Sequence, residues 1–333
     1  MPISDPGVTV SGVGAFLPEK RLTNADLEKM VDTSDAWILE RTGVKERRIA
    51  PPEMATSDMA THAALQALDM AGLDPGELEL IIVGTITPDM PFPSTACLVQ
   101  RNLKASKAAA FDVSAACTGF IYGFATATSM IRAGAYRNAL VIGADTLSRI
   151  TDWNDRATCV LFGDGAGAVV LQRADHRGDG SGVLGFELGA DGTGWDLLML
   201  PAGGSSNPAS VQTVEDRLHY IKMNGNQVFR FAVKAMGTAA AGCLKRCGLT
   251  YADVNLFIPH QANYRIIESA AQRLGIPMEK VAVNIDRYGN MSSASIPVAL
   301  DECIREGRVS HGDVVLMVAF GSGLTWGAAA FRR

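Results

Sequence analysis

Two stretches of this sequence share one pattern: Gly72–Ile82, which reads GLDPGELELII, and Gly248–Ile258, which reads GLTYADVNLFI. Each begins with Gly-Leu, continues through a four-residue turn and ends in an apolar run that is typical of a buried strand. The second stretch lies 176 residues after the first. Because self-similarity at this distance is the signature of a repeated unit, the pattern predicts a duplicated structure.

Two further pairs of segments occur in the same order in both parts of the chain. Ile131–Gly134 and Ile304–Gly307 each lead into an apolar strand. Phe162–Gly165 and Phe320–Gly323 each precede an alanine-rich strand. Each match is weak alone, but three matches in one order support duplication of the whole unit.

Apolar strands alternate with helical patterns along the chain. A helix is expected from Ser57 to Ala71, with Ser57 as N-cap and a glycine stop after it. Nearly continuous apolar strands separated by helices predict an α/β fold with a covered sheet. We expect one half over residues 1–174 and a second over 211–333, with 175–210 as the connecting segment.

Composition and charge exclude several classes of protein. The 333 residues are 47% hydrophobic and 20% charged, enough to fill a sizeable core. A net charge of −5 argues against general nucleic-acid binding. No apolar run approaches the ~18 residues of a membrane span, and the N-terminus lacks the pattern of a signal peptide. Six cysteines without a C-x-x-C pair indicate a reducing, cytoplasmic environment and no zinc site.

Cys117 is the candidate nucleophile. It lies in Phe111–Phe120, FDVSAACTGF, which predicts a strand, a turn of small residues and a helix from about Thr118. A cysteine at a helix N-terminus feels the positive end of the helix dipole, which favours the thiolate. The alternative is a packed core thiol, and this is our interpretation of Cys97, Cys159, Cys243, Cys247 and Cys303.

His260 and Asn290 are the candidate partners of Cys117. His260 directly follows a predicted buried strand, at the edge of the sheet where α/β proteins bind ligands, although a structural histidine is the alternative. Asn290 alone would be interpreted as a helix cap or turn residue. It lies 173 residues after Cys117, close to the spacing of the repeat. We therefore expect Cys117 and Asn290 to begin equivalent helices that face one central place.

Two glycine-rich loops follow or precede predicted strands. Gly321–Gly323 can approach a ligand closely and offer N–H groups to an oxyanion. Its counterpart is Gly163–Gly167. Neither loop fits G-x-G-x-x-G, so a dinucleotide site is poorly supported.

These residues resemble the condensing enzymes of the thiolase fold, most closely the β-ketoacyl-acyl-carrier-protein synthase III family. The resemblance rests on Asp35–Ile38 with Arg41–Gly43, Ala115–Gly119, Asp155–Thr158, Phe162–Gly167, Pro259–Asn263, Tyr288–Ser292 and Gly321–Gly327. The elongating synthases use Cys–His–His, so Asn290 is the discriminating residue. The resemblance implies an α/β thiolase-like fold of duplicated βαβαβαββ halves in a five-layered α-β-α-β-α arrangement, and a homodimer.

The resemblance also implies a reaction, a decarboxylating condensation that begins fatty acid synthesis. Cys117 would take a short acyl group, expected to be acetyl, from acyl-CoA. Malonyl-acyl-carrier-protein would then bind and lose CO2, while His260 and Asn290 hydrogen-bond the enolate oxygen. The main-chain N–H groups of Cys117 and Ser322 would form the oxyanion hole. No metal or redox cofactor is implied.

Binding roles follow from the same resemblance. Trp37 would stack on the CoA adenine, and Arg41 and Arg156 would contact the CoA nucleotide. Phe92 would close the acyl pocket of the neighbouring subunit. The remaining implied contacts are Phe320 and Asn263 with the substrate, and Gln261, Ala262, Asn263, Tyr264 and Arg265 with the acidic carrier protein.

Three alternatives stay open at the level of sequence. A specialised relative in secondary metabolism would use another starter or acceptor. A thiolase would condense without decarboxylation, but thiolases use a second cysteine near the C-terminal glycine loop, and Gly321–Gly327 contains none. A non-catalytic acyl-binding protein is disfavoured because Cys117, His260 and Asn290 are all present.

Overall fold

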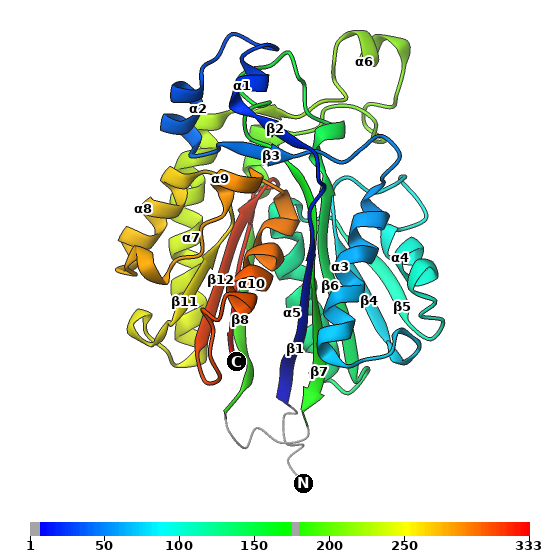
Figure 1. Ribbon diagram of the computed structural model, residues 1–333, viewed down its shortest axis with the longest axis vertical. Helices are drawn as coiled ribbons and strands as arrows, with labels where there is room; N and C mark the ends of the chain where they lie inside the picture. Colours follow the sequence, from blue (N-terminus) through cyan, green and yellow to red (C-terminus); the bar gives the residue numbers. More distant parts are fainter. Residues whose placement is uncertain (1–6, 175–179) are drawn as a thin grey trace.

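The computed structural model describes residues 7–174 and 180–333, which form two α/β halves that lie side by side (Figure 1). The core of the first half consists of β1 (Gly7–Phe16), α3 (Thr56–Ala71), β4 (Leu80–Gly84), α4 (Thr95–Leu103), β5 (Ala109–Val113), α5 (Gly119–Arg132), β6 (Asn138–Thr146) and β7 (Asp164–Ala174). The sheet has the order β1-β7-β6-β4-β5. Strand β4 runs parallel to β5 and β6, whereas β7 runs antiparallel to β1 and β6.

The second half repeats this topology. Its core consists of β8 (Gly182–Ala190), α7 (Gly225–Cys247), β11 (Leu256–Pro259), α8 (Tyr264–Leu274), α10 (Ser295–Arg305), β12 (Val314–Gly321) and β13 (Thr325–Arg332). The sheet has the order β11-β12-β13-β8, with β11 parallel to β12 and β13 antiparallel to both of its neighbours. A single parallel bridge between Phe257 and Val281 occupies the place of β5.

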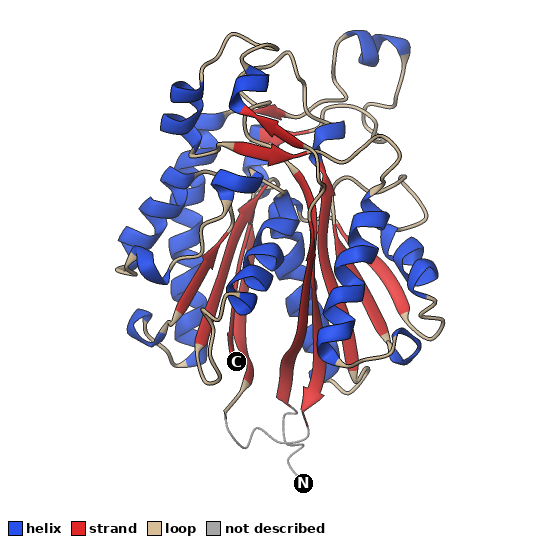
Figure 2. Ribbon diagram, viewed as in Figure 1, coloured by secondary structure: helices blue, strands red, loops and turns tan. Residues whose placement is uncertain are grey.

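The helices and sheets form five layers (Figure 2). Helices α5 and α10 lie between the sheets, where α5 contacts β4, β6 and β13 and α10 contacts β1, β7 and β11. On the outer faces, α3 and α4 cover the first sheet, and α7 and α8 cover the second. This is the predicted α-β-α-β-α arrangement, with α5 and α10 shared by both halves.

Shorter elements lie at one end of the molecule, toward which β12 points (Figure 1). They are β2 (Arg21–Thr23), α1 (Asn24–Leu27), α2 (Asp35–Thr42), β3 (Glu46–Arg48), β9 (Leu198–Met199), α6 (Val211–Glu215), β10 (Lys222–Met223) and α9 (Ile285–Tyr288). No helix in the described ranges has the length and apolar character needed to cross a membrane.

The predicted repeat corresponds to equivalent helix ends. Gly72 ends α3 and Gly248 ends α7, both in the left-handed region with φ of 60° and 68°. A 3-10 turn follows each, over Pro75–Glu77 and Tyr251–Asp253, and then β4 or β11 begins. Helix α3 itself begins one residue earlier than predicted, at Thr56, with an alanine at the N-cap. The repeated Gly-Leu pattern is therefore the C-cap of a helix followed by a turn.

The predicted equivalence of Cys117 and Asn290 is wrong by three residues. The 3-10 turns before α5 and α10 begin at Ala116 and Ser292, both with a positive φ, of 47° and 48°. Cys117 is therefore equivalent to Ser293. The reason is that α5 has 14 residues and α10 has 11, so the spacing of the repeat changes inside these helices.

The predicted connecting segment, 175–210, contains part of the second sheet. Its residues 175–179 lie outside the described part of the chain. Residues 182–190 form β8, which pairs with β13 along its length. The edge strand of the second half is therefore supplied by the segment that was expected to join the halves.

Candidate active site

Cys117 lies where the two halves meet, in the turn before α5. Close backbone approaches fix this turn. A Cβ at Gly84, the last residue of β4, would lie 2.5 Å from the carbonyl carbon of Gly119. A Cβ at Gly321, the last residue of β12, would lie 2.9 Å from the backbone nitrogen of Cys117. Both glycines are required because the sheets of both halves approach the Cys117 turn directly.

The surroundings of the Cys117 thiol oppose its ionisation. Burial raises the pKa of the thiol to about 12, the neighbouring Ser292 hydroxyl lowers it, and the carboxylate of Asp145 raises it further. The prediction of a resting thiolate considered only the helix dipole. Desolvation has the larger effect here, so the thiol is protonated at neutral pH before a substrate binds.

The His260 imidazole is buried directly after β11. Its side chain is 1% exposed, and its ring packs edge-on against Phe320 with 5.5 Å between ring centroids. Desolvation lowers the pKa of His260 to about 3, so the ring is neutral at physiological pH. Within the described residues, neither ring nitrogen has a hydrogen-bond partner. Buried polar atoms without partners are rare, and here they indicate a place for a ligand.

Asn290 is held by the glycine loop of the first half. Its backbone N–H donates to the Leu161 carbonyl at 2.8 Å, and its carbonyl accepts from Gly163 at 3.0 Å. Its side-chain Oδ1 accepts from the Ser292 amide at 2.8 Å. Since the oxygen of the amide is occupied in this way, Nδ2 is the group that the side chain offers to a substrate.

Two cavities meet at Cys117. The first, of about 260 Å³, is lined by Cys117, His260, Asn290 and Phe320, and Trp37 and Arg41 belong to its outer wall. The second, of about 340 Å³, is mainly apolar and is lined by Cys117, Ile86, Leu147, Ile150, Phe162, Leu198 and Ile221, among others. Cys117, His260 and Asn290, predicted from three distant segments, are therefore brought together in one cavity.

Two cations lie close to the Trp37 ring, which lines the first cavity. The guanidinium groups of Arg41 and Arg156 lie 5.3 Å and 4.7 Å from the ring centroid of Trp37. Arg156 also forms an ion pair with Asp32 at 3.3 Å. A flat ring with adjacent positive charge has the chemistry to bind a nucleotide base and its phosphates.

Asn263 joins this region to α8. Its Nδ2 donates to the Arg41 carbonyl at 2.8 Å, and its Oδ1 caps α8 by accepting from the Arg265 amide at 2.9 Å. Ala262 is half-buried in the wall of the first cavity, whereas Tyr264 and Arg265 are exposed. Both exposed residues are accessible to a partner protein.

Gln261 cannot contact a carrier protein in the predicted way. The residue is completely buried, and all four hydrogen bonds that its side-chain amide can form are made inside the protein. A polar residue beside a candidate catalytic histidine looks the same in a sequence whether it faces a partner or the interior. Burial decides between the two, and Gln261 has an internal role.

Two other predicted site residues, Phe92 and Ser322, do not present a side chain to the first cavity. Phe92 is 85% exposed and lines neither cavity of its own chain, so its predicted role requires a second subunit. The Ser322 hydroxyl donates to the Leu198 carbonyl, while Ser322 itself lines the second cavity. Its side chain is therefore engaged, so the predicted oxyanion role would fall to its main-chain N–H.

Asp145 is a buried site residue that the sequence analysis missed. It is fully buried at the end of β6, and burial raises its pKa. Its carboxylate accepts hydrogen bonds from Thr85, Ile86, Thr87 and Ser293. It therefore joins the two halves behind Cys117. A carboxylate at the end of a continuous apolar run, Leu140–Ala144, was the available signal.

No metal centre is found in the residues that the structure describes, since no three His, Cys, Asp or Glu side chains are grouped to hold an ion. The chemistry available at this site is that of a half-buried thiol, a neutral imidazole, an amide and main-chain N–H groups. Such a set can transfer an acyl group and stabilise an oxyanion or enolate.

Comparisons with known proteins identify the family of this chain. A family model described as 3-oxoacyl-[acyl-carrier-protein] synthase III matches residues 111–192, and the model of its C-terminal part matches 244–333. The β-ketoacyl-[acyl-carrier-protein] synthase III of Caldanaerobacter subterraneus is 58% identical over 323 residues, which cover 97% of each chain.

Solved structures extend the similarity to the whole fold. The 3-oxoacyl-[acyl-carrier-protein] synthase III of Aquifex aeolicus has 51% identity and a TM-score of 0.91, covering 98% of this chain and 100% of that one. The priming β-ketosynthase of the R1128 polyketide pathway has 36% identity and a TM-score of 0.90, covering 100% and 98%.

Fold and site together define an acyl-transferring condensing enzyme of the thiolase-like class. Within that class, the chain belongs to the β-ketoacyl-[acyl-carrier-protein] synthase III family.

Proposed function

We propose that this chain condenses a short acyl-CoA with malonyl-acyl-carrier-protein, giving 3-oxoacyl-acyl-carrier-protein, CoA and CO2 in the first condensation of fatty acid synthesis. The observation that carries the proposal is the place of Cys117 between two cavities, with His260 and Asn290 in one of them. This arrangement gives one sulfur access to an acyl donor, an acyl chamber and an enolate-stabilising pair.

The first half-reaction is acyl transfer. The Cys117 sulfur attacks the thioester carbonyl, the C–S bond to CoA breaks, and the thiol proton ends on the departing CoA sulfur. Because the Cys117 pKa is raised to about 12, proton loss accompanies the attack rather than preceding it. The N–H groups of Cys117 and Ser322 stabilise the tetrahedral oxyanion. Trp37, Arg41 and Arg156 hold the CoA nucleotide.

The second half-reaction is decarboxylation and carbon–carbon bond formation. The malonyl C–CO2 bond breaks, and its electron pair forms an enolate whose oxygen accepts hydrogen bonds from His260 and Asn290. A neutral imidazole suits this role because one of its nitrogens carries a proton to donate and it does not protonate the nascent carbanion. The enolate carbon attacks the acyl-Cys117 carbonyl, the C–S bond breaks, and the sulfur leaves as a thiolate that takes a proton from solvent. These steps balance without a metal or redox cofactor, and we propose that none takes part.

The starter group is expected to be acetyl, but the second cavity also fits a longer one. Its volume of about 340 Å³ falls within the ~300–1,000 Å³ range of small-molecule pockets, and its walls are mainly apolar. This observation favours testing a second candidate function, a specialised synthase with a longer starter. The similar R1128 protein is named as the priming ketosynthase of a polyketide pathway.

We also propose that the working unit is a cytoplasmic homodimer that docks an acidic carrier protein beside Tyr264 and Arg265. Phe92 and Met90 are large apolar side chains exposed on one loop, which is a feature of surfaces that contact a partner. Arg265 is an exposed cation near the first cavity, as an acidic partner requires. The six cysteines are free, consistent with a reducing compartment.

The two half-reactions can be tested separately. We expect His260→Ala and Asn290→Ala to accept an acyl group on Cys117 at near wild-type rates but to decarboxylate malonyl-acyl-carrier-protein at least ~100-fold more slowly, since each removes an enolate donor. The measurements are acyl transfer by mass spectrometry and CO2 release by a coupled assay, with a panel of acyl-CoA starters in the wild type. Equal loss of both half-reactions would contradict the assigned roles.

A further inference from the structure

A single helical turn, α9, precedes Asn290 in the segment of chain that leads from His260 to Asn290. His260 follows β11, and the chain returns beside that strand at Val281 before α9 begins at Ile285. Helix α9 ends at Tyr288, two residues before Asn290. The Asn290 backbone is fixed on one side by Leu161 and Gly163, and on the other side its position relative to His260 depends on how α9 is held.

Gln261 holds the start of α9. Its Oε1 accepts from the amides of Asn284 and Ile285 at 3.0 Å and 3.2 Å. Its Nε2 donates to the carbonyls of Pro259 and Ala282 at 2.8 Å and 3.1 Å. This side chain, adjacent to His260 in the sequence, ties the end of β11 to the first turn of α9.

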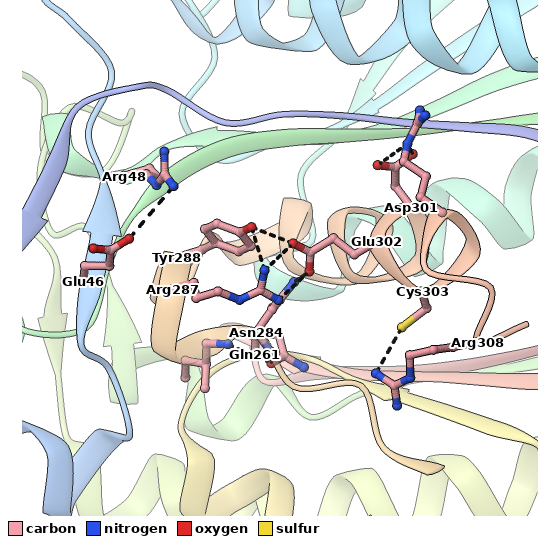
Figure 3. A network of polar contacts seen from close by, with 12 residues as sticks. Glu46, Arg48, Gln261, Asn284, Arg287, Tyr288, Asp301, Glu302, Cys303 and Arg308 are labelled. Carbon is pink, nitrogen blue, oxygen red and sulfur yellow. Dashed lines mark hydrogen bonds and ion pairs between the residues drawn. The ribbon is translucent and has the colours of Figure 1, made fainter. Parts of the chain in front are cut away.

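Glu302 holds the other side of α9 from α10 (Figure 3). Its Oε1 accepts from Tyr288 at 2.6 Å and from Arg287 at 3.0 Å. Its Oε2 accepts from Asn284 at 2.8 Å and from Arg287 at 3.1 Å. Three residues at both ends of α9 thus converge on one carboxylate, which is 18% exposed.

Helix α9 requires this external support. It has four residues, whereas isolated helices shorter than ~12–15 residues are marginal in water. Glu302 accepts hydrogen bonds from three residues of one short segment, Asn284, Arg287 and Tyr288. The N-terminal residue of that segment, Asn284, does not cap α9 with its own side chain. Gln261 supplies the cap instead.

The Asn290 backbone is also held from the first half, by Leu161 and Gly163. Loss of the carboxylate would loosen the other support, α9, and so allow the Asn290 side chain to move relative to His260.

We propose that Glu302, acting through α9 and together with Gln261, is a positioning residue that sets the distance between His260 and Asn290 for enolate formation. The inference rests on the proposed function, in which those two side chains share the enolate oxygen. Cys117 lies on a different element, the turn before α5, and within the described residues is not bonded to α9, so the acyl-transfer half-reaction should be much less sensitive to Glu302 than decarboxylation is.

The test compares Glu302→Ala, Glu302→Gln and a matched control, Asp301→Ala. Asp301 is the preceding residue of α10 and is buried, but its carboxylate bonds to Arg305 at 2.8 Å and 3.0 Å, away from α9 (Figure 3). For each variant, Cys117 acylation by acyl-CoA and CO2 release from malonyl-acyl-carrier-protein are measured, with kcat and KM determined separately. The thermal unfolding midpoint reports folding.

We expect Glu302→Ala to lower kcat for decarboxylation by at least ~10-fold, because small misplacements of reacting groups cost this much or more. Its KM and its acylation rate should stay within about twofold of wild type. Glu302→Gln keeps the length of the side chain and one acceptor oxygen. Its decarboxylation rate should therefore lie between those of Glu302→Ala and wild type, at least about threefold below wild type. Asp301→Ala should match wild type in both half-reactions.

The proposal is overturned if Glu302→Ala decarboxylates at the wild-type rate, or if it loses both half-reactions equally while folded. If Glu302→Ala does not fold, Glu302→Gln decides, and a wild-type decarboxylation rate in that variant overturns the proposal. Failure of the wild-type chain to acylate Cys117 would instead refute the proposed function itself, so the two failures are distinguishable.

Discussion

A desolvated thiol reacts only when its proton can leave, and this condition governs the chemistry of Cys117. Burial raises the pKa of Cys117 to about 12 and lowers that of His260 to about 3. Both groups are therefore neutral around pH 7 in the resting site. The apolar surroundings keep the imidazole as a hydrogen-bond donor, at the cost of a less ionised nucleophile.

The raised pKa predicts the pH dependence of alkylation at Cys117. Since the thiolate is the reacting form, the rate of iodoacetamide labelling should rise about tenfold per pH unit from about pH 7 to 10 without levelling off. Peptide mass spectrometry follows Cys117 separately from the exposed Cys97, which serves as an internal control. A plateau near pH 7 would show instead that the helix dipole overcomes desolvation.

The lowered pKa of His260 predicts a loss of stability in acid. The unfolded chain binds a proton near the ordinary value of 6.5, whereas the folded chain does not until about pH 3. Folding is therefore opposed as the pH falls below about 6.5, by up to about 1.4 kcal/mol per pH unit. Above about pH 6.5, His260 is neutral in both the folded and the unfolded chain, so it does not change the free energy of unfolding.

The measurement is urea unfolding of wild type and His260→Leu at about pH 7.5 and pH 5. Other buried acids titrate in both proteins, so their contributions cancel in the difference between the two free energies of unfolding. The wild type should lose about 2 kcal/mol more than the variant between these two pH values. Equal losses in the two proteins would contradict a desolvated imidazole.

At the scale of elements, the Cys117 turn is set by two strand ends and the glycines in them. Gly84 and Gly321 end β4 and β12, and both pack against the backbone around Cys117. Gly192, by contrast, has a negative φ, and a Cβ at this position would meet no atom of the described residues within 4 Å. A comparison of alanine variants at Gly84 and Gly192 therefore separates the effect of a steric clash from the general effect of replacing a glycine.

We predict that Gly84→Ala slows acylation of Cys117 and lowers the free energy of unfolding by about 1–3 kcal/mol, because a Cβ 2.5 Å from the Gly119 carbonyl carbon forces α5 to shift. Gly192→Ala should leave both unchanged. Urea unfolding and acylation kinetics check the pair. Identical behaviour of the two variants would argue against the close approach.

The elements of the repeat could be predicted from the sequence because their signals are local. Gly72 and Gly248 mark helix ends through their left-handed conformation, and apolar runs mark strands. The pairing of Cys117 with Ser293 could not be predicted, because a three-residue difference between α5 and α10 is invisible without the helix boundaries. The internal role of Gln261 was likewise hidden, since a motif identifies a residue but not the direction of its side chain.

At the scale of the whole molecule, duplication explains the position of the site. Helices α5 and α10 lie between the sheets, and their preceding turns meet at the centre. The first half supplies Cys117 and Asp145, and the second supplies His260 and Asn290. Cys117, His260 and Asn290 could be predicted from motifs. The position of Asp145 had a signal in the sequence, but the partners of Asp145 and Glu302 could not be predicted, because they lie in other segments.

The exposed loop with Phe92 predicts a homodimer in solution. Sedimentation equilibrium should give twice the chain mass of 35.2 kDa. Phe92→Asp should weaken the dimer, because it places a charge in an apolar contact, while Leu65→Asp serves as a control at another exposed apolar position. A monomer at all concentrations in the wild type would contradict the proposed role of Phe92.

The central claim is that Cys117 carries the acyl group between the two substrates. Intact mass spectrometry tests it directly, first with acetyl-CoA and then after addition of malonyl-acyl-carrier-protein, with Cys117→Ala as the control. The account predicts one acetyl adduct, localised to Cys117 and absent from the variant, which disappears when the malonyl partner is added. An adduct that persists in Cys117→Ala, or one on Cys117 that the malonyl partner does not discharge, would contradict it.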